Sequence, residues 1–172
     1  MIGRSLLKWI GVDAQAVEPA VLDRAAASLD GLHPDRARYV AAFAYLLARV
    51  AGVDSRVTAD EMDLMHRLVQ REAELTDAEA TAVVDLALRD AVKFAGSHNL
   101  DVTREFMALS TFDQRLGLMR CLFAVSAADD SVATAEDNEV RRISRELKIE
   151  HADFVRARAE VREHLAVLRG SR

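Results

Sequence analysis

The stretches AGVDSRVTADE (residues 51–61) and SAADDSVATAE (residues 126–136) write one pattern at two places in the chain. In each, an acidic turn follows an apolar segment and precedes an amphipathic one. Asp54 in the first copy aligns with Asp129 in the second, a spacing of 75 positions (129 − 54). Such a repeat predicts two copies of one helical hairpin, packed about a pseudo-twofold axis.

The composition favours helices over strands throughout the chain. Among 172 residues, 51% are hydrophobic, and there are only seven Gly and two Pro. Four segments place Glu, Gln or Asp three residues after a Thr, the pattern of a helix capping box; they begin at Thr58, Thr76, Thr111 and Thr134. We predict an all-α compact bundle of about seven to nine helices, built from the two pseudo-symmetric hairpins. The expected helices cover residues 3–10, 19–29, 35–52, 59–73, 77–95, 101–109, 112–128, 135–147 and 151–169.

The expected organisation is an N-terminal helical extension, residues 1–34, followed by one all-helical domain, residues 35–170. The first segment, MIGRSLLKWIGV (residues 1–12), has two interpretations: its Leu and Trp side chains pack on the core, or they make a weak contact with a membrane surface. We favour packing. No apolar stretch reaches the roughly 18 to 20 residues that span a bilayer. With a single cysteine, the chain is predicted to be cytoplasmic, peripheral to the inner membrane under the second interpretation.

Charge and residue spacing argue against two classes of function. The net charge of −5 is opposite to what phosphate neutralisation requires, so we expect no nucleic-acid binding. Neither Cys121 nor Ser126 has a neighbouring general base in the sequence, and there is no Gly-rich phosphate loop. The protein is therefore not expected to be an enzyme.

The acidic turns themselves have two interpretations, which the spacing leaves open. In the first, Asp54 and Glu61 only satisfy backbone groups at the turn and the helix start. In the second, Asp54 and Glu61, together with Asp129, Asp130 and Glu136, are oxygen ligands of a divalent cation. Carboxylates suit Ca²⁺ or Mg²⁺ better than Zn²⁺, and the spacing is not that of an EF-hand.

The two turns resemble the mark of the TerB-like family, A-D-G-x-[VL]-x-x-x-E at the head of a helix; here it reads GVDSRVTADE and ADDSVATAE. The tail, EDNEVRRISRELKIEHADFVRAR, resembles the stand-alone cytoplasmic subgroup, with His151, Asp153 and Phe154 in the matching turn. The resemblance covers roughly residues 36–158.

The resemblance implies an all-helical bacterial protein with a role in tellurite or other stress responses. It also implies a metal site at Asp54, Glu61, Asp129 and Glu136, with Asp130 as a further ligand. Related domains are fused to J-domain co-chaperones, which implies a protein partner of unknown identity and, as the alternative function, a metal-free interaction module. Ser55 and Asp130 stand where the family has Gly, and we expect Ser55 to alter the turn and weaken the site.

Overall fold

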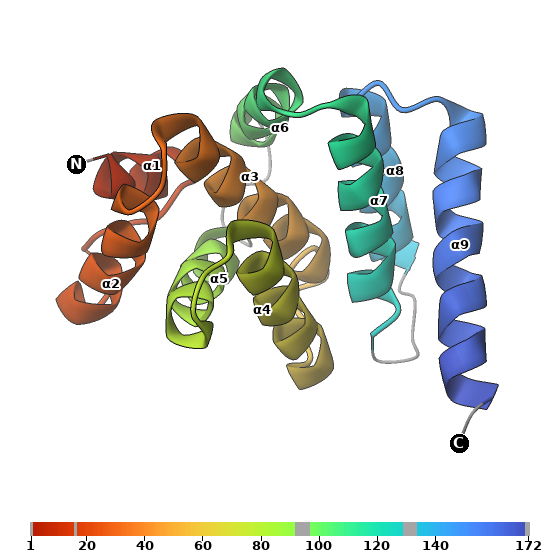
Figure 1. Ribbon diagram of the computed structural model, residues 1–172, viewed down its shortest axis with the longest axis horizontal. Helices are drawn as coiled ribbons and strands as arrows, with labels where there is room; N and C mark the ends of the chain where they lie inside the picture. Colours follow the sequence, from red (N-terminus) through yellow and green to blue (C-terminus); the bar gives the residue numbers. More distant parts are fainter. Residues whose placement is uncertain (1, 16, 92–96, 129–133, 171–172) are drawn as a thin grey trace.

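The computed structural model describes residues 2–15, 17–91, 97–128 and 134–170, and within these ranges the chain forms helices and no strand (Figure 1). The all-α prediction is therefore confirmed. The helices are α1 (Gly3–Trp9), α2 (Pro19–Asp30), α3 (Pro34–Ala51), α4 (Ala59–Ala73), α5 (Asp77–Ala91), α6 (Ser97–Leu109), α7 (Phe112–Ser126), α8 (Thr134–Glu146) and α9 (His151–Gly170).

Capping boxes start three of these helices, as the sequence predicts. At α4, the Thr58 Oγ1 accepts a hydrogen bond from the Glu61 amide at 3.2 Å, and the Thr58 amide donates to Glu61 Oε2 at 2.7 Å. The boxes that begin at Thr76 and Thr111 have the same reciprocal bonds. The fourth predicted box, at Thr134, lies at the edge of a described range, where α8 is described from Thr134 onward, and it stays a prediction.

The central element is α3, which packs against seven other helices: α1, α2, α4, α5, α6, α7 and α8. Its residues 39–51 are all buried, and many are alanines, whose small side chains let neighbouring helices approach closely. In Figure 1, α1 and α2 lie at one end of the molecule and α9 at the other.

The repeat extends to three helices in each half, α3–α4–α5 and α7–α8–α9, and α3 packs on α7. The second helix of each unit is followed by a left-handed residue, Glu74 (φ 56°) or Lys148 (φ 54°). The next residue, Leu75 or Ile149, is buried, and its amide donates to the carbonyl five residues earlier, at 3.1 and 2.9 Å. Both units therefore end their second helix with a Schellman motif, so the duplicated element is larger than the predicted hairpin.

The N-terminal segment packs on the core, as the favoured interpretation predicts. Leu7 and Ile10 are fully buried, and the Asp30 carboxylate accepts hydrogen bonds from the Ile2 and Gly3 amides at 2.6 and 2.8 Å. A Cβ at Gly3 would lie 2.1 Å from a backbone oxygen of α2, so this close approach requires glycine. In the described part of the chain, no helix has the length and hydropathy to cross a bilayer. Contact with a membrane surface, and the division of the chain at residue 34, stay predictions.

Candidate functional site

The first acidic turn lies at the surface between α3 and α4. Asp54 is exposed, and its Oδ1 accepts a hydrogen bond from the Arg56 amide at 3.0 Å, which closes a local turn. Ser55 has φ 62°, the left-handed conformation that a glycine adopts without strain. The turn therefore keeps, with Ser55, a backbone conformation that glycine favours, at a cost of roughly 1–2 kcal/mol. The expectation that Ser55 alters the turn is not borne out in its backbone.

Glu61, the second acidic residue of this copy, lies inside the protein with 1% of its surface exposed. Its Oε2 accepts hydrogen bonds from the Thr58 amide at 2.7 Å and from the Thr58 hydroxyl at 2.9 Å. The first turn of α4 also presents backbone amides and the positive end of the helix dipole, which stabilise a carboxylate there. Glu61 is thus held in one orientation, whereas Asp54 is solvated.

In the second copy, Glu136 occupies the place that corresponds to Glu61. It lies in the first turn of α8 with 4% of its surface exposed. The other two predicted ligands, Asp129 and Asp130, lie outside the described residues. Within the described ranges, no three His, Cys, Asp or Glu side chains are close enough to hold a metal ion. The five-residue cation site therefore stays a prediction.

An open groove of about 950 Å³ lies between α4, α7 and α9, which appear in that order, with α7 in the middle, in Figure 1. Asp60 and Asp63, in the first turns of α4, line one part of the groove. Ala127 and Ala128, which directly precede the second acidic turn, also line it. The groove thus connects the neighbourhoods of the two turns.

Polar contacts cross one wall of this groove. The Arg120 Nε of α7 donates to the Glu160 carboxylate of α9 at 2.6 Å. Beside it, burial raises the pKa of the Cys121 thiol to about 11. Because the thiol is neutral at physiological pH, Cys121 is a poor nucleophile and acts as a wall residue.

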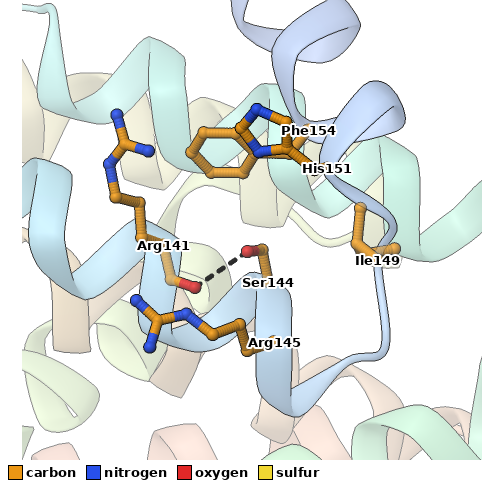
Figure 2. Close-up of a pocket in the computed structure, with 6 residues that line it drawn as sticks. All are labelled: Arg141, Ser144, Arg145, Ile149, His151 and Phe154. Atoms are coloured by element: carbon orange, nitrogen blue, oxygen red, sulfur yellow. Dashed lines mark hydrogen bonds between the residues drawn. The ribbon is translucent and has the colours of Figure 1, made fainter.

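A second pocket, of about 360 Å³, lies at the junction of α8 and α9; it is lined by Arg141, Ser144, Arg145, Ile149, His151 and Phe154. Figure 2 shows the His151 ring lying over the Phe154 ring, with 6.4 Å between the centroids. The Arg141 guanidinium lies 5.2 Å from the centre of the same ring. Phe154 also meets Phe123 of α7 edge to face at 5.1 Å. His151 therefore packs on Phe154 within the first turn of α9, and this family-like turn anchors α9.

The polar cluster around Arg49, in the middle of the molecule, is a feature that the sequence analysis did not predict. Arg49 is 4% exposed, yet it pairs with Glu139 and makes a two-pronged contact with Glu146 at 2.9 and 3.1 Å. Thr103 of α6 contacts both Arg49 and Glu146. Burial alone would raise the pKa of the Glu146 carboxyl, but the Arg49 hydrogen bonds and charge hold it below its usual value. A single arginine in the apolar run 39–50 is the only signal of this cluster in the sequence.

Comparison with known families adds one finding to this geometry. The family model described as tellurite resistance protein TerB matches residues 40–159, most of the chain. No curated protein and no solved structure matches the chain significantly. The matched range contains both acidic turns, the α3–α7 centre and the α8–α9 junction. The chain therefore belongs to the TerB family.

Proposed function

We propose that this TerB-family protein binds a divalent cation through its two acidic turns, and that cation binding serves resistance to tellurite or a related stress. The ligands of the proposed site are Asp54, Glu61, Asp129, Asp130 and Glu136. Their oxygen donors favour Ca²⁺ or Mg²⁺ over Zn²⁺. The proposal assigns binding, not catalysis, to the protein.

The observation that carries the proposal is a buried glutamate at the same place in both copies. Glu61 and Glu136 lie 75 positions apart, each in the first turn of the second helix of its unit, with 1% and 4% of their surfaces exposed. Glutamate is seldom buried to this extent unless its charge is compensated. Capping compensates the charge of Glu61, and a buried glutamate recurs at the corresponding place in the second copy. Its repetition beside two acidic turns favours a shared requirement for negative charge.

Such a site would combine a ligand that is fixed in place, Glu61, with a ligand that can move, Asp54. The capping box fixes Glu61 through Oε2, so Oε1 is the atom proposed to reach a cation. Asp54 is exposed and can move toward the ion at little cost. Because Ca²⁺ accepts flexible ligand sets and Mg²⁺ requires near-octahedral geometry, a site that includes the exposed Asp54 carboxylate fits Ca²⁺ better.

Calorimetry tests the cation proposal directly. We expect saturable binding of Ca²⁺ or Mg²⁺ to the full chain, and weaker or no binding of Zn²⁺. The double variant Asp54→Asn, Asp129→Asn should lose at least about tenfold in affinity, because two anionic ligands become neutral. The matched control Glu18→Gln, Glu163→Gln removes two exposed carboxylates elsewhere and should bind as the wild type does. Equal binding by both variants, or no binding by the wild type, contradicts the proposal.

The link to stress resistance needs a separate measurement in cells. A strain that lacks this gene is complemented with the wild type or with Asp54→Asn, Asp129→Asn, and growth on tellurite is compared. We expect the wild type to restore growth and the double variant to fail at equal protein level. Restoration by both would separate cation binding from tellurite resistance.

A further inference from the structure

The groove between α4, α7 and α9 has an occupied counterpart in the other half of the molecule. The 75-residue offset of the repeat relates residues that line the groove to residues of the buried Arg49 cluster. Arg120, Ala124, Leu64 and Arg71 of the groove correspond to Tyr45, Arg49, Glu139 and Glu146 of the cluster. The helix pair α3–α8 therefore corresponds to the pair α7–α4, and both pairs pack together.

A helix fills the occupied counterpart. α6 packs on α3 and α8, where Asn99 hydrogen-bonds to Tyr45, and Thr103 contacts Arg49 and Glu146. Asn99 and Thr103 are one helical turn apart, so one face of α6 meets the cluster. In the groove, Ala124 replaces the long Arg49 side chain. α9 lines one side of the groove, where Glu160 accepts a hydrogen bond from Arg120. The remaining volume is open.

The charges along the groove indicate what would fill it. Arg67 and Arg71 lie one turn apart on the exposed face of α4, and neither forms an ion pair within the described ranges of the chain. Asp60 and Asp63 line the first turns of α4 in the same groove, and Asp63 lies one turn before Arg67. Arg71, at the other end, has no acidic residue within one turn on α4 among the described lining residues. Leu64, Leu68 and Val161 supply an apolar surface beside the two arginines. From Asp60 to Arg71 the groove follows α4 for about 16 Å, three helical turns.

We infer that this groove binds an amphipathic α-helix of a partner protein, seated as α6 is seated in the other half. The partner helix presents an apolar face to Leu64 and Leu68 and a carboxylate to Arg71. The partner helix carries a Glu at the position that corresponds to Thr103 of α6. This Glu contacts Arg71 in the way that Thr103 contacts Glu146. The described lining residues of this surface include none of Asp54, Glu61 and Glu136.

The α6 sequence supplies the probe for a test. A fluorescent peptide of residues 97–109 carrying Thr103→Glu is titrated against the full chain, and its twin carrying Thr103→Lys serves as the charge control. We expect the acidic peptide to bind at least about tenfold more tightly than its twin (about 1.4 kcal/mol). It should also slow alkylation of Cys121, the only cysteine, which lines the groove.

Two variants locate the binding surface. Arg71→Glu should weaken the acidic peptide at least about tenfold and favour the lysine twin, whereas Arg24→Glu, the same charge change on exposed α2, should change neither. No binding of the acidic peptide, binding that leaves Cys121 alkylation unchanged, or equal binding to Arg71→Glu overturns the inference. A dimer of the chain alone that Arg71→Glu abolishes would place a second copy in the groove and would also overturn it.

Discussion

The α3–α8 contact and the α7–α4 contact are formed by corresponding helices of the two repeats. Only the α3–α8 contact is covered by another helix, α6. Between α3 and α8, Arg49 and two glutamates fill the interior, and α6 covers them. Between α7 and α4, Ala124 leaves an open groove of about 950 Å³. The same backbone arrangement therefore encloses a buried polar cluster in one half and leaves an open groove in the other. A few side-chain differences at corresponding positions, such as Arg49 and Ala124, are enough to produce this contrast.

The third helices of the two units differ in the same direction. α5 packs on α2, α3 and α4 through small residues such as Ala80, Val83 and Ala87. α9 packs chiefly on α7, through a narrow seam that includes Phe154 and Ala157. Among the described side chains, α5 buries six hydrophobic ones, whereas α9 buries two, Phe154 and Ala157. The second half is therefore the more open one.

Removal of Arg49 should have the largest effect on stability. Arg49→Ala leaves the largely buried Glu139 without its cation and leaves Glu146 with only the more exposed Arg142. Breaking a buried pair costs about 3–5 kcal/mol. Urea unfolding followed by circular dichroism measures the loss. The matched control is Arg120→Ala, which breaks the exposed Arg120–Glu160 pair and should cost less than about 1 kcal/mol. If both variants lost the same free energy of unfolding, the buried Arg49 cluster would be no more important for stability than the exposed Arg120–Glu160 pair.

Truncation of Phe154 should have the next largest effect, because it removes the main anchor of α9. Phe154 is buried and contacts both Phe123 and His151, so Phe154→Ala should cost about 3 kcal/mol. Its exposed neighbour Val155 is the control, and Val155→Ala should change stability by less than about 0.5 kcal/mol. If Phe154→Ala cost no more than Val155→Ala, α9 would be held by contacts other than this seam.

Acid should weaken the buried Arg49 cluster through Glu146, by less than the loss of Arg49. The folded pKa of Glu146 lies below its usual value of 4.5. The stabilisation is therefore complete above pH 4.5 and is lost as the pH falls through the lowered folded pKa. Unfolding curves between pH 6 and pH 3 should show a steeper loss of stability for the wild type than for Glu146→Gln. Parallel curves would show that Glu146 does not contribute to the acid sensitivity.

Ser55→Gly should have the smallest effect, and a favourable one. It relieves a left-handed serine, which costs roughly 1–2 kcal/mol, but increases the freedom of the unfolded chain, so the net gain should be about 0.5 kcal/mol. Thermal unfolding measures it, with Ser28→Gly, inside α2, as the control that should lose stability. A loss of stability with Ser55→Gly would contradict the strained turn.

Local chemistry made most of the fold predictable. Thr58 with Glu61 and Thr111 with its Gln mark helix starts that depend on residues three positions apart, so the sequence alone locates them. α6 begins four residues earlier than the predicted residue 101, where Asn99 makes a long-range contact with Tyr45 that no local pattern reveals. The partners of Arg49 were not predicted for the same reason, because they lie 90 and 97 positions away in the sequence.

The candidate site was predictable only as a pattern. The spacing of Asp54 and Glu61 indicates an acidic turn that leads into a helix. Asp54 lies in that turn, and Glu61 lies in the first turn of α4. Whether an acidic side chain is buried or solvated depends on the packing of α3 and α4, which the repeat does not report. The groove was missed because its lining residues come from three helices far apart in the sequence.

The central claim is that both acidic turns serve one cation, and Mn²⁺ added to the ¹⁵N-labelled protein tests it most directly. Paramagnetic broadening reports which backbone amides lie near the bound ion. The account predicts that substoichiometric Mn²⁺ broadens the amides of residues 54–61 and of residues 128–136 together, and that Ca²⁺ or Mg²⁺ restores both sets. Broadening of one turn without the other, or uniform broadening over the whole acidic surface, would contradict it.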